Sequence, residues 1–169
     1  MVNQRSNIIS TQEFREKNKK PKVGACIWKW KDVHSKLMDE TSTVSSGSSG
    51  SISLVNADVG DGILPGLNAS VQVLKAGKDN NVHSHRHSML AIFVVYQGEG
   101  YSIIDGEKIE WEKGDVVVAP PWLDHGHCNT SETEDAILLN IQDIPRVSDM
   151  GLWFIEEPED ESPRHIIEE

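Results

Sequence analysis

Residues 83–129 read HSHRHSMLAIFVVYQGEGYSIIDGEKIEWEKGDVVVAPPWLDHGHCN. Short segments rich in Val and Ile alternate here with turns that contain Gly, Asp or Pro, a texture typical of antiparallel strands. The same texture extends outward from residue 66 to residue 144. Many short strands with almost no helix predict an all-β sandwich or small barrel.

The expected strands are the apolar segments, and the expected turns are the Gly-, Asp- and Asn-containing segments between them. Asp105-Gly106 lies between two apolar segments and is a strong hairpin signal. The other expected turns lie at 78–81, 98–100 and 113–115. Strands are predicted at 69–74, 89–96, 100–104, 108–111, 116–119 and 136–142.

The segments before the β region are expected to be helical or irregular. Residues 11–22 predict a short helix or a disordered arm that Pro21 ends. Residues 26–40 predict a short strand leading into a helix, and the Ser/Gly-rich run 41–53 predicts a flexible loop. We therefore divide the chain into a basic arm (1–25), an extension with the Ser/Gly loop (26–65), a β domain (66–155) and an acidic tail (156–169).

The charge distribution restricts the partners. The 169 residues include 27 Asp and Glu against 16 Lys and Arg, a formal net charge of −11 that disfavours nucleic acid and anionic membranes as partners. Residues 1–25 carry six basic against two acidic residues, net +4, whereas residues 156–169 carry seven acidic against one basic, net −6. These are either two solvated ends or an arm that meets the tail of a second subunit, and the second interpretation agrees with the homodimer that we expect from exposed edge strands.

The cysteines and apolar runs indicate the compartment. No apolar run approaches the roughly 20 residues needed to cross a bilayer, and the first residues lack the hydrophobic region of a signal peptide. Cys26 and Cys128 are the only cysteines, too few for a disulfide framework. We expect a cytoplasmic protein.

Five of the seven histidines fall into two clusters that predict a metal site. Side chains two apart share one face of an extended chain, so each cluster presents its rings to one side. His83 and His87 are roughly 13 Å apart in a strand, too far for both to bind one ion, so only one adjacent pair of the first cluster can do so. The clusters are His83, His85 and His87, and His125 and His127.

The segment 114–129, GDVVVAPPWLDHGHCN, resembles the second cupin motif, with Trp122 in place of the motif's second glycine. The spacing back from Gly98 matches the first cupin motif and selects His85 and His87, with Ala91 where many cupins carry a Glu ligand. This resemblance implies a single cupin domain, a double-stranded β-helix or jelly-roll-like barrel.

The chain is more specifically similar to gentisate 1,2-dioxygenases and 1-hydroxy-2-naphthoate dioxygenases, through its HRH and PPWxxH segments and over roughly residues 27–157. It resembles the C-terminal half of these enzymes, which usually contain two cupin domains. The resemblance implies iron bound by His85, His87 and His125, and cleavage of a gentisate- or salicylate-like aromatic acid by O2.

The ligand set leaves the metal and the activity open. Three neutral imidazoles leave a divalent ion its full charge, which favours an anionic chelating ligand and suits Fe(II), with Zn, Mn and Ni as alternatives. The competing functions are a non-catalytic cupin that binds a small ligand, and an isomerase or lyase that acts on a small oxygenated acid.

Strand alternation predicts the remaining site residues. It points Arg86 away from its histidine neighbours. The resemblance to the cupin motif selects His85 and His87, which leaves His83 behind the ligands or at the rim of the pocket. His127 is expected to support the site by a hydrogen bond or to act as an acid or base, and we list His127 and His83 as catalytic candidates. The expected substrate pocket consists of Met89, Ala91, Phe93, Gln97 and Trp122.

Overall fold

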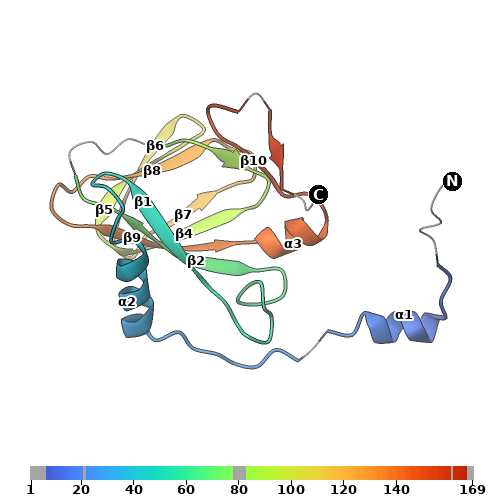
Figure 1. The fold of residues 1–169 in the computed structure, drawn as a ribbon. Coiled ribbons are helices and arrows are strands. Elements are labelled where there is room, and N and C mark those ends of the chain that lie inside the picture. Colours follow the sequence, from blue (N-terminus) through green and yellow to red (C-terminus); the bar gives the residue numbers. More distant parts are fainter. Residues whose placement is uncertain (1–6, 21, 78–82, 161, 167–169) are drawn as a thin grey trace.

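The computed structural model describes residues 7–20, 22–77, 83–160 and 162–166. Two antiparallel sheets face each other and enclose the core (Figure 1). One has the order β1-β2-β9-β4-β7, formed by Ser49–Leu54, Asn68–Leu74, Ala136–Gln142, Ala91–Gln97 and Val116–Ala119. The other has the order β6-β5-β8, formed by Glu107–Glu112, Glu99–Ile104 and His125–Asn129.

A small third sheet joins the C-terminal segment to the first histidine cluster. In it β10 (Phe154–Glu156) pairs with β11 (Arg164–His165) and with β3 (Arg86–His87). The pairing of Ile155 with His87 therefore places the strand that carries His87 directly beside the C-terminal segment.

The barrel interior contains one apolar cluster. Its members come from both large sheets and alternate with outward-facing residues along each strand, as strands around one core require. They are Leu74, Ala91, Phe93, Val95, Ile104, Trp111, Val117, Ala119, Ala136 and Leu138.

A second apolar cluster covers the outer face of the large sheet. Helix α2 (Trp30–Glu40) lies against β1 and β2 and buries Val33 and Leu37. The strands contribute the side chains that alternate with the interior ones, because successive residues point to opposite faces. They are Val71, Val73 and Ile137, with Ile52, Leu54 and Leu139 partly buried around them.

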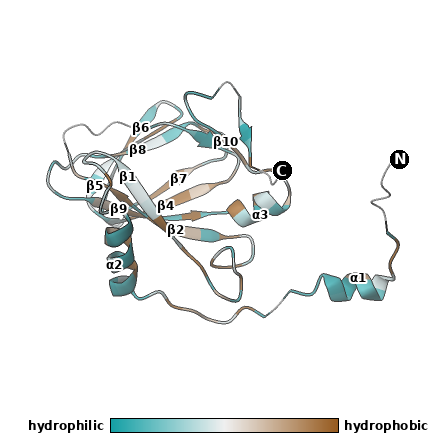
Figure 2. Ribbon diagram, viewed as in Figure 1, coloured by the Kyte–Doolittle hydropathy of each residue, from teal (hydrophilic) through white to brown (hydrophobic). Residues whose placement is uncertain are grey.

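The other two helices differ in their packing. Helix α1 (Thr11–Lys17) is capped by the Ser10 side chain, has no buried residue and lies away from the barrel, with mainly hydrophilic colouring in Figure 2. Helix α3 (Ile144–Asp149) follows β9 directly and buries Pro145 and Val147. Within the described part of the chain, no helix is long and apolar enough to span a membrane.

The predicted all-β class is confirmed, and six observed strands coincide with the predicted ones within two residues. The prediction of a flexible Ser/Gly loop over residues 41–53 was wrong in part. Residues 49–54 form β1, which pairs along its length with β2. The expected strand before α2 does not form, and β8 and α3 were not predicted. Pro21, the expected helix stop, and the turn at 78–81 lie outside the described residues.

Candidate metal centre

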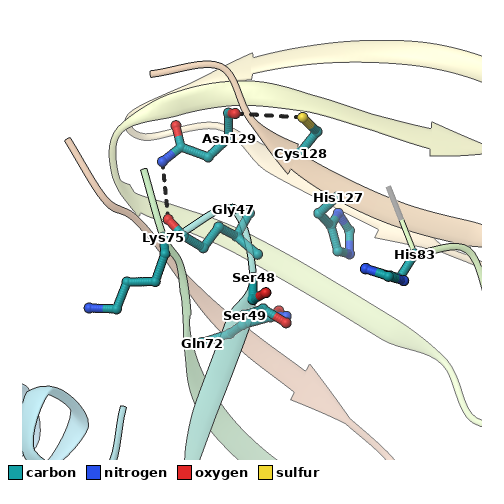
Figure 3. A pocket seen from close by; sticks show the side chains of 10 residues that line it. Gly47, Ser48, Ser49, Gln72, Lys75, His83, His127, Cys128 and Asn129 are labelled. Atoms are coloured by element: carbon teal, nitrogen blue, oxygen red, sulfur yellow. Dashed lines mark hydrogen bonds between the residues drawn. The ribbon is translucent and has the colours of Figure 1, made fainter. Parts of the chain in front are cut away.

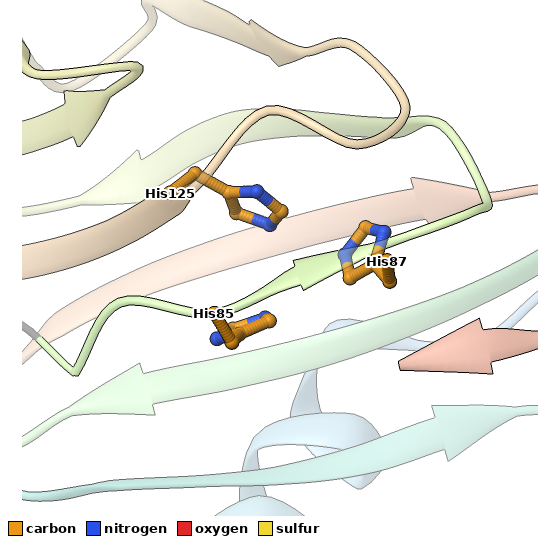
Figure 4. A group of neighbouring side chains, drawn as sticks. All are labelled: His85, His87 and His125. Carbon is orange, nitrogen blue, oxygen red and sulfur yellow. The ribbon is translucent and has the colours of Figure 1, made fainter. Parts of the chain in front are cut away.

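Three of the clustered histidines converge inside the barrel. His85 and His125 belong to different segments but exchange two backbone hydrogen bonds, of 3.0 Å and 2.8 Å, which hold them side by side. His87 follows on the same face, two residues after His85. One nitrogen from each of His85, His87 and His125 lies within 4.8 Å of the others (Figure 4).

The orientation of two rings suits metal coordination. The Nδ1 atoms of His87 and His125 lie 2.8 Å from the carbonyl oxygens of Met89 and Leu123. A carbonyl can only accept, so each Nδ1 carries the proton and each Nε2 keeps its lone pair. The Nε2 atom of His125 is buried without a hydrogen-bond partner. A cation between the rings would satisfy this atom, so the donor set fits a divalent metal.

Burial keeps the rings of His87 and His125 neutral. Desolvation, followed by the nearby His125 ring, lowers the pKa of His87 to about 4. Desolvation also lowers the pKa of His125. The metal-binding form of imidazole is therefore the one present at neutral pH. Among the described residues, no Asp or Glu joins the three histidines.

His127 lies next to this trio but has different partners. Its ring packs edge-on against Phe93, with 4.1 Å between ring centroids, and its Nδ1 lies 2.7 Å from the Ser102 hydroxyl. Desolvation, reinforced by His125 and His85, lowers its pKa to about 3. Figure 3 shows its ring directed toward the exposed His83, and both residues line a small cavity of about 50 Å³ together with Gln72 and Lys75.

No sequence pattern assigned Gln72 and Ser102 to the interior. Gln72 accepts a hydrogen bond of 3.2 Å from the Asn140 amide, whereas the Asn140 oxygen is buried and has no partner. Asn140 is 8% exposed and lies opposite Phe93 in the β4–β9 register. These polar residues alternate with the outer apolar ones on β2 and β9, so alternation could have found them once the outer face was known.

The predicted pocket residues are only partly brought together. Met89, Ala91 and Phe93 are buried, but Gln97 is exposed and donates to the Asp135 carbonyl. A register shift between Val95 and Gln97 ends the alternation, so the prediction that Gln97 faces the interior was wrong.

Trp122 lies in a different environment from the one expected. It is 40% exposed and lines an apolar groove with Val147, Met150 and Leu152, away from the cavity that contains His127. Its φ of +64° is the left-handed conformation that the glycine of the cupin motif would adopt freely. Its N–H donates to the His87 carbonyl over 2.8 Å, so this strained turn connects the two motifs.

Arg86 points away from the histidines, in agreement with the alternation. Its guanidinium pairs with Glu156 at 2.7 Å and lies 5.8 Å from the Trp122 ring centroid. The ion pair also raises the pKa of Arg86. Arg86 therefore ties β3 to β10 and leaves the interior without an arginine from residues 66–144.

Comparison with known proteins agrees with this geometry. The sequence model of the cupin domain family matches residues 70–142 of this chain. A 5-nitrosalicylic acid 1,2-dioxygenase from Bradyrhizobium sp. is 30% identical over 96% of this chain and 81% of its own length. The chain therefore belongs to the cupin family, and the relatives that it matches are aromatic-acid dioxygenases.

Two further similarities are partial. A 1-hydroxy-2-naphthoate 1,2-dioxygenase from Nocardioides sp. (strain KP7) is 32% identical over 77% of this chain but only 33% of its own length. The salicylate 1,2-dioxygenase of Pseudoaminobacter salicylatoxidans superposes with a TM-score of 0.68 and 22% identity over 79% of this chain and 37% of that one. The chain thus spans about a third of each of these enzymes, and the superposition supports the fold.

Proposed function

We propose that this protein is an Fe(II)-dependent ring-cleaving dioxygenase for a gentisate- or salicylate-like hydroxylated aromatic acid. The observation that carries the proposal is the convergence of His85, His87 and His125 inside a cupin barrel, with the Nε2 atom of His125 buried and unpartnered. The relative from Bradyrhizobium, aligned over nearly the whole chain, supports this activity over others.

The three histidines would hold the metal through one nitrogen each. Fe(II) is the proposed ion, and Zn, Mn and Ni are alternatives that the same donors accept. When bound, the iron supplies a Lewis acid and a redox centre for the reaction of O2 with the aromatic ring. The carbonyls of Met89 and Leu123 hold the protons of two ligands at Nδ1 and so fix the ring orientations.

The surrounding side chains would bind and orient the substrate. Ala91 is buried at the position where many cupins carry a Glu ligand, so it would add no charge to the three histidines. Phe93 and Met89 provide buried apolar walls that exclude water. The unpartnered oxygen of Asn140 offers an acceptor for a substrate hydroxyl, and His83 and His127 flank the cavity.

Oxygen uptake tests this activity directly. The protein is loaded with Fe(II) without oxygen and then mixed with gentisate, salicylate, 5-nitrosalicylate or 1-hydroxy-2-naphthoate in an oxygen electrode. We expect uptake with at least one acid, loss of uptake in His85→Ala, and retention in His34→Ala, an exposed histidine on α2.

The outcomes also separate the alternative functions. Iron binding with ligand affinity but no oxygen uptake would identify a non-catalytic binding cupin. Conversion of a small oxygenated acid without oxygen uptake would identify an isomerase or lyase. Either result would refute the dioxygenase proposal.

We propose further that the chain forms a homodimer in the cytoplasm. Strand β7 is an edge of the large sheet, and its Val116 and Val118 are 59% and 54% exposed, an apolar edge that pairing with a second copy would cover. Cys26 is exposed and Cys128 is buried, and two cysteines are too few for a disulfide framework, as a reducing compartment favours. Light scattering that gives a monomer mass would refute the dimer.

The division into arm, extension, cupin domain and tail is also proposed. It is supported by α1, which has no buried residue, and by α2, which packs on the outer face of the barrel. We therefore expect the arm to be dispensable for folding, whereas the extension is part of the folded unit.

A further inference from the structure

Three side chains form a chain of hydrogen bonds behind the metal centre. The indole Nε1 of Trp111 donates to the Ser102 hydroxyl over 3.0 Å, and the Ser102 oxygen lies 2.7 Å from Nδ1 of His127. Ser102 is fully buried and Trp111 nearly so. The three residues come from neighbouring strands of one sheet, β6, β5 and β8.

The chemistry of the two outer groups fixes the direction of these bonds. Indole N–H can only donate, so the Ser102 oxygen accepts from Trp111 and must place its own proton elsewhere. Among the described residues, His127 is the only side chain within hydrogen-bond distance that could accept this proton. If Nδ1 carried the ring proton, the Ser102 hydroxyl proton would be buried without an acceptor, at a cost in folding free energy.

We propose that the Trp111–Ser102 pair fixes His127 as the neutral tautomer with its proton on Nε2. This arrangement leaves an N–H donor on the ring of His127, which lines the small cavity shared with His83. Ser102 and Trp111 act through His127, so they are positioning residues. The inference deepens the proposed function, because it names the group that this ring offers to a bound acid: a donor for a carboxylate or phenolate oxygen.

The same reasoning separates His127 from the metal ligands. His87 and His125 direct Nδ1 at backbone carbonyls, which leaves a lone pair on Nε2 for a cation. His127 directs Nδ1 at a hydroxyl whose proton is available, which leaves a proton on Nε2. The nitrogens of the three other rings converge within 4.8 Å, whereas an N–H at Nε2 would make His127 a hydrogen-bond donor beside them.

One glycine makes room for this arrangement. A Cβ atom on Gly100 would lie 2.5 Å from Cη2 of Trp111, closer than atoms approach in proteins. Gly100 faces Trp111 in the β5–β6 register, so its missing side chain lets the indole cross the sheet toward Ser102. The observed orientation of the indole therefore requires a residue without a side chain at position 100.

Nuclear magnetic resonance tests the tautomer without substrate or iron. Protein labelled with 15N-histidine is prepared metal-free and, separately, with Zn, and long-range proton–nitrogen correlations identify which ring nitrogen carries the proton. His127→Gln assigns the signal. We expect the Nε2–H form in an excess of roughly tenfold or more at neutral pH. A dominant Nδ1–H form in the wild-type protein would overturn the proposal.

Variants test the role of the two positioning residues. Ser102→Ala removes the donor to Nδ1, and Trp111→Phe removes the N–H that orients the Ser102 hydroxyl toward Nδ1. Both should give mixed tautomers, whereas Thr130→Ala, which removes a hydroxyl at the end of β8, should not. An unchanged tautomer in folded Ser102→Ala refutes the role of Ser102, and if that variant does not fold, Trp111→Phe and the wild-type spectrum decide. Because no turnover is measured, these results do not depend on whether the dioxygenase proposal holds.

Discussion

The two faces of strands β2 and β9 differ in a way that separates stability from function. On the outer face Val71, Val73 and Ile137 are buried against α2 in an ordinary apolar cluster. On the inner face, at the alternating positions, Gln72 and Asn140 point their amides into the barrel. Leu74 and Leu138 on the same inner face belong to the apolar interior cluster, but buried amides with an unpartnered oxygen do not stabilise a core. The amide-bearing part of the inner face is therefore where we propose that substrate binds.

The largest expected effect is the loss of metal from the three histidines inside the barrel. In His125→Ala one of three ligands is gone, and the remaining two cannot hold a divalent ion against dialysis. We expect about one metal per chain in the wild type and close to none in the variant by elemental analysis. Unchanged circular dichroism would show that the fold is intact, and retention of the metal would contradict the assigned site.

The outer face should respond to truncation with a loss of stability. Leu37 is fully buried between α2 and the sheet, so Leu37→Ala should lower the free energy of unfolding by about 2–5 kcal/mol. Urea denaturation followed by fluorescence measures this change. The metal content of the folded fraction should stay at the wild-type value, and a parallel loss of metal would show that the two faces are coupled.

Acidification should destabilise the metal-free protein because His87 is buried. The pKa of His87 falls from 6.5 to about 4 on folding, so between these values the unfolded chain binds the additional proton. The stability is therefore fully present above about pH 6.5 and falls by roughly 1–3 kcal/mol as the pH approaches 4. In His87→Gln, the free energy of unfolding should fall less between pH 6.5 and pH 4 than in the wild type. Equal pH dependences of the two proteins would show that His87 is not the residue responsible.

The smallest change in stability is expected at Asn140. A substitution there should instead affect the binding of the substrate. Asn140→Leu replaces a partly satisfied amide with an apolar group of similar size, so the free energy of unfolding should change by less than about 1 kcal/mol. If the amide binds the substrate, KM should rise roughly 5- to 30-fold. Leu139→Val, on the outer face of the same strand, is the matched control and should leave KM unchanged.

Much of the fold was predictable because its signals are local. Val- and Ile-rich segments between Gly- and Asp-containing turns located β2, β4 to β7 and β9. Strand β1 was missed because its SGSISL sequence has little intrinsic strand preference, and its structure comes from pairing with β2. Helix α3 was missed because Pro145 was not recognised as the first turn of a helix.

The sequence by itself determined the all-β class and the pairing of two histidine motifs, because side chains two residues apart share a face in any extended chain. The tertiary structure alone decided which polar residues enter the barrel, since the β4 bulge turns Gln97 outward while the β2–β9 pairing brings Gln72 to Asn140. It also decided the proton partners of each ring. Those partners are carbonyls and a hydroxyl from other positions in the chain, and no spacing rule gives their location.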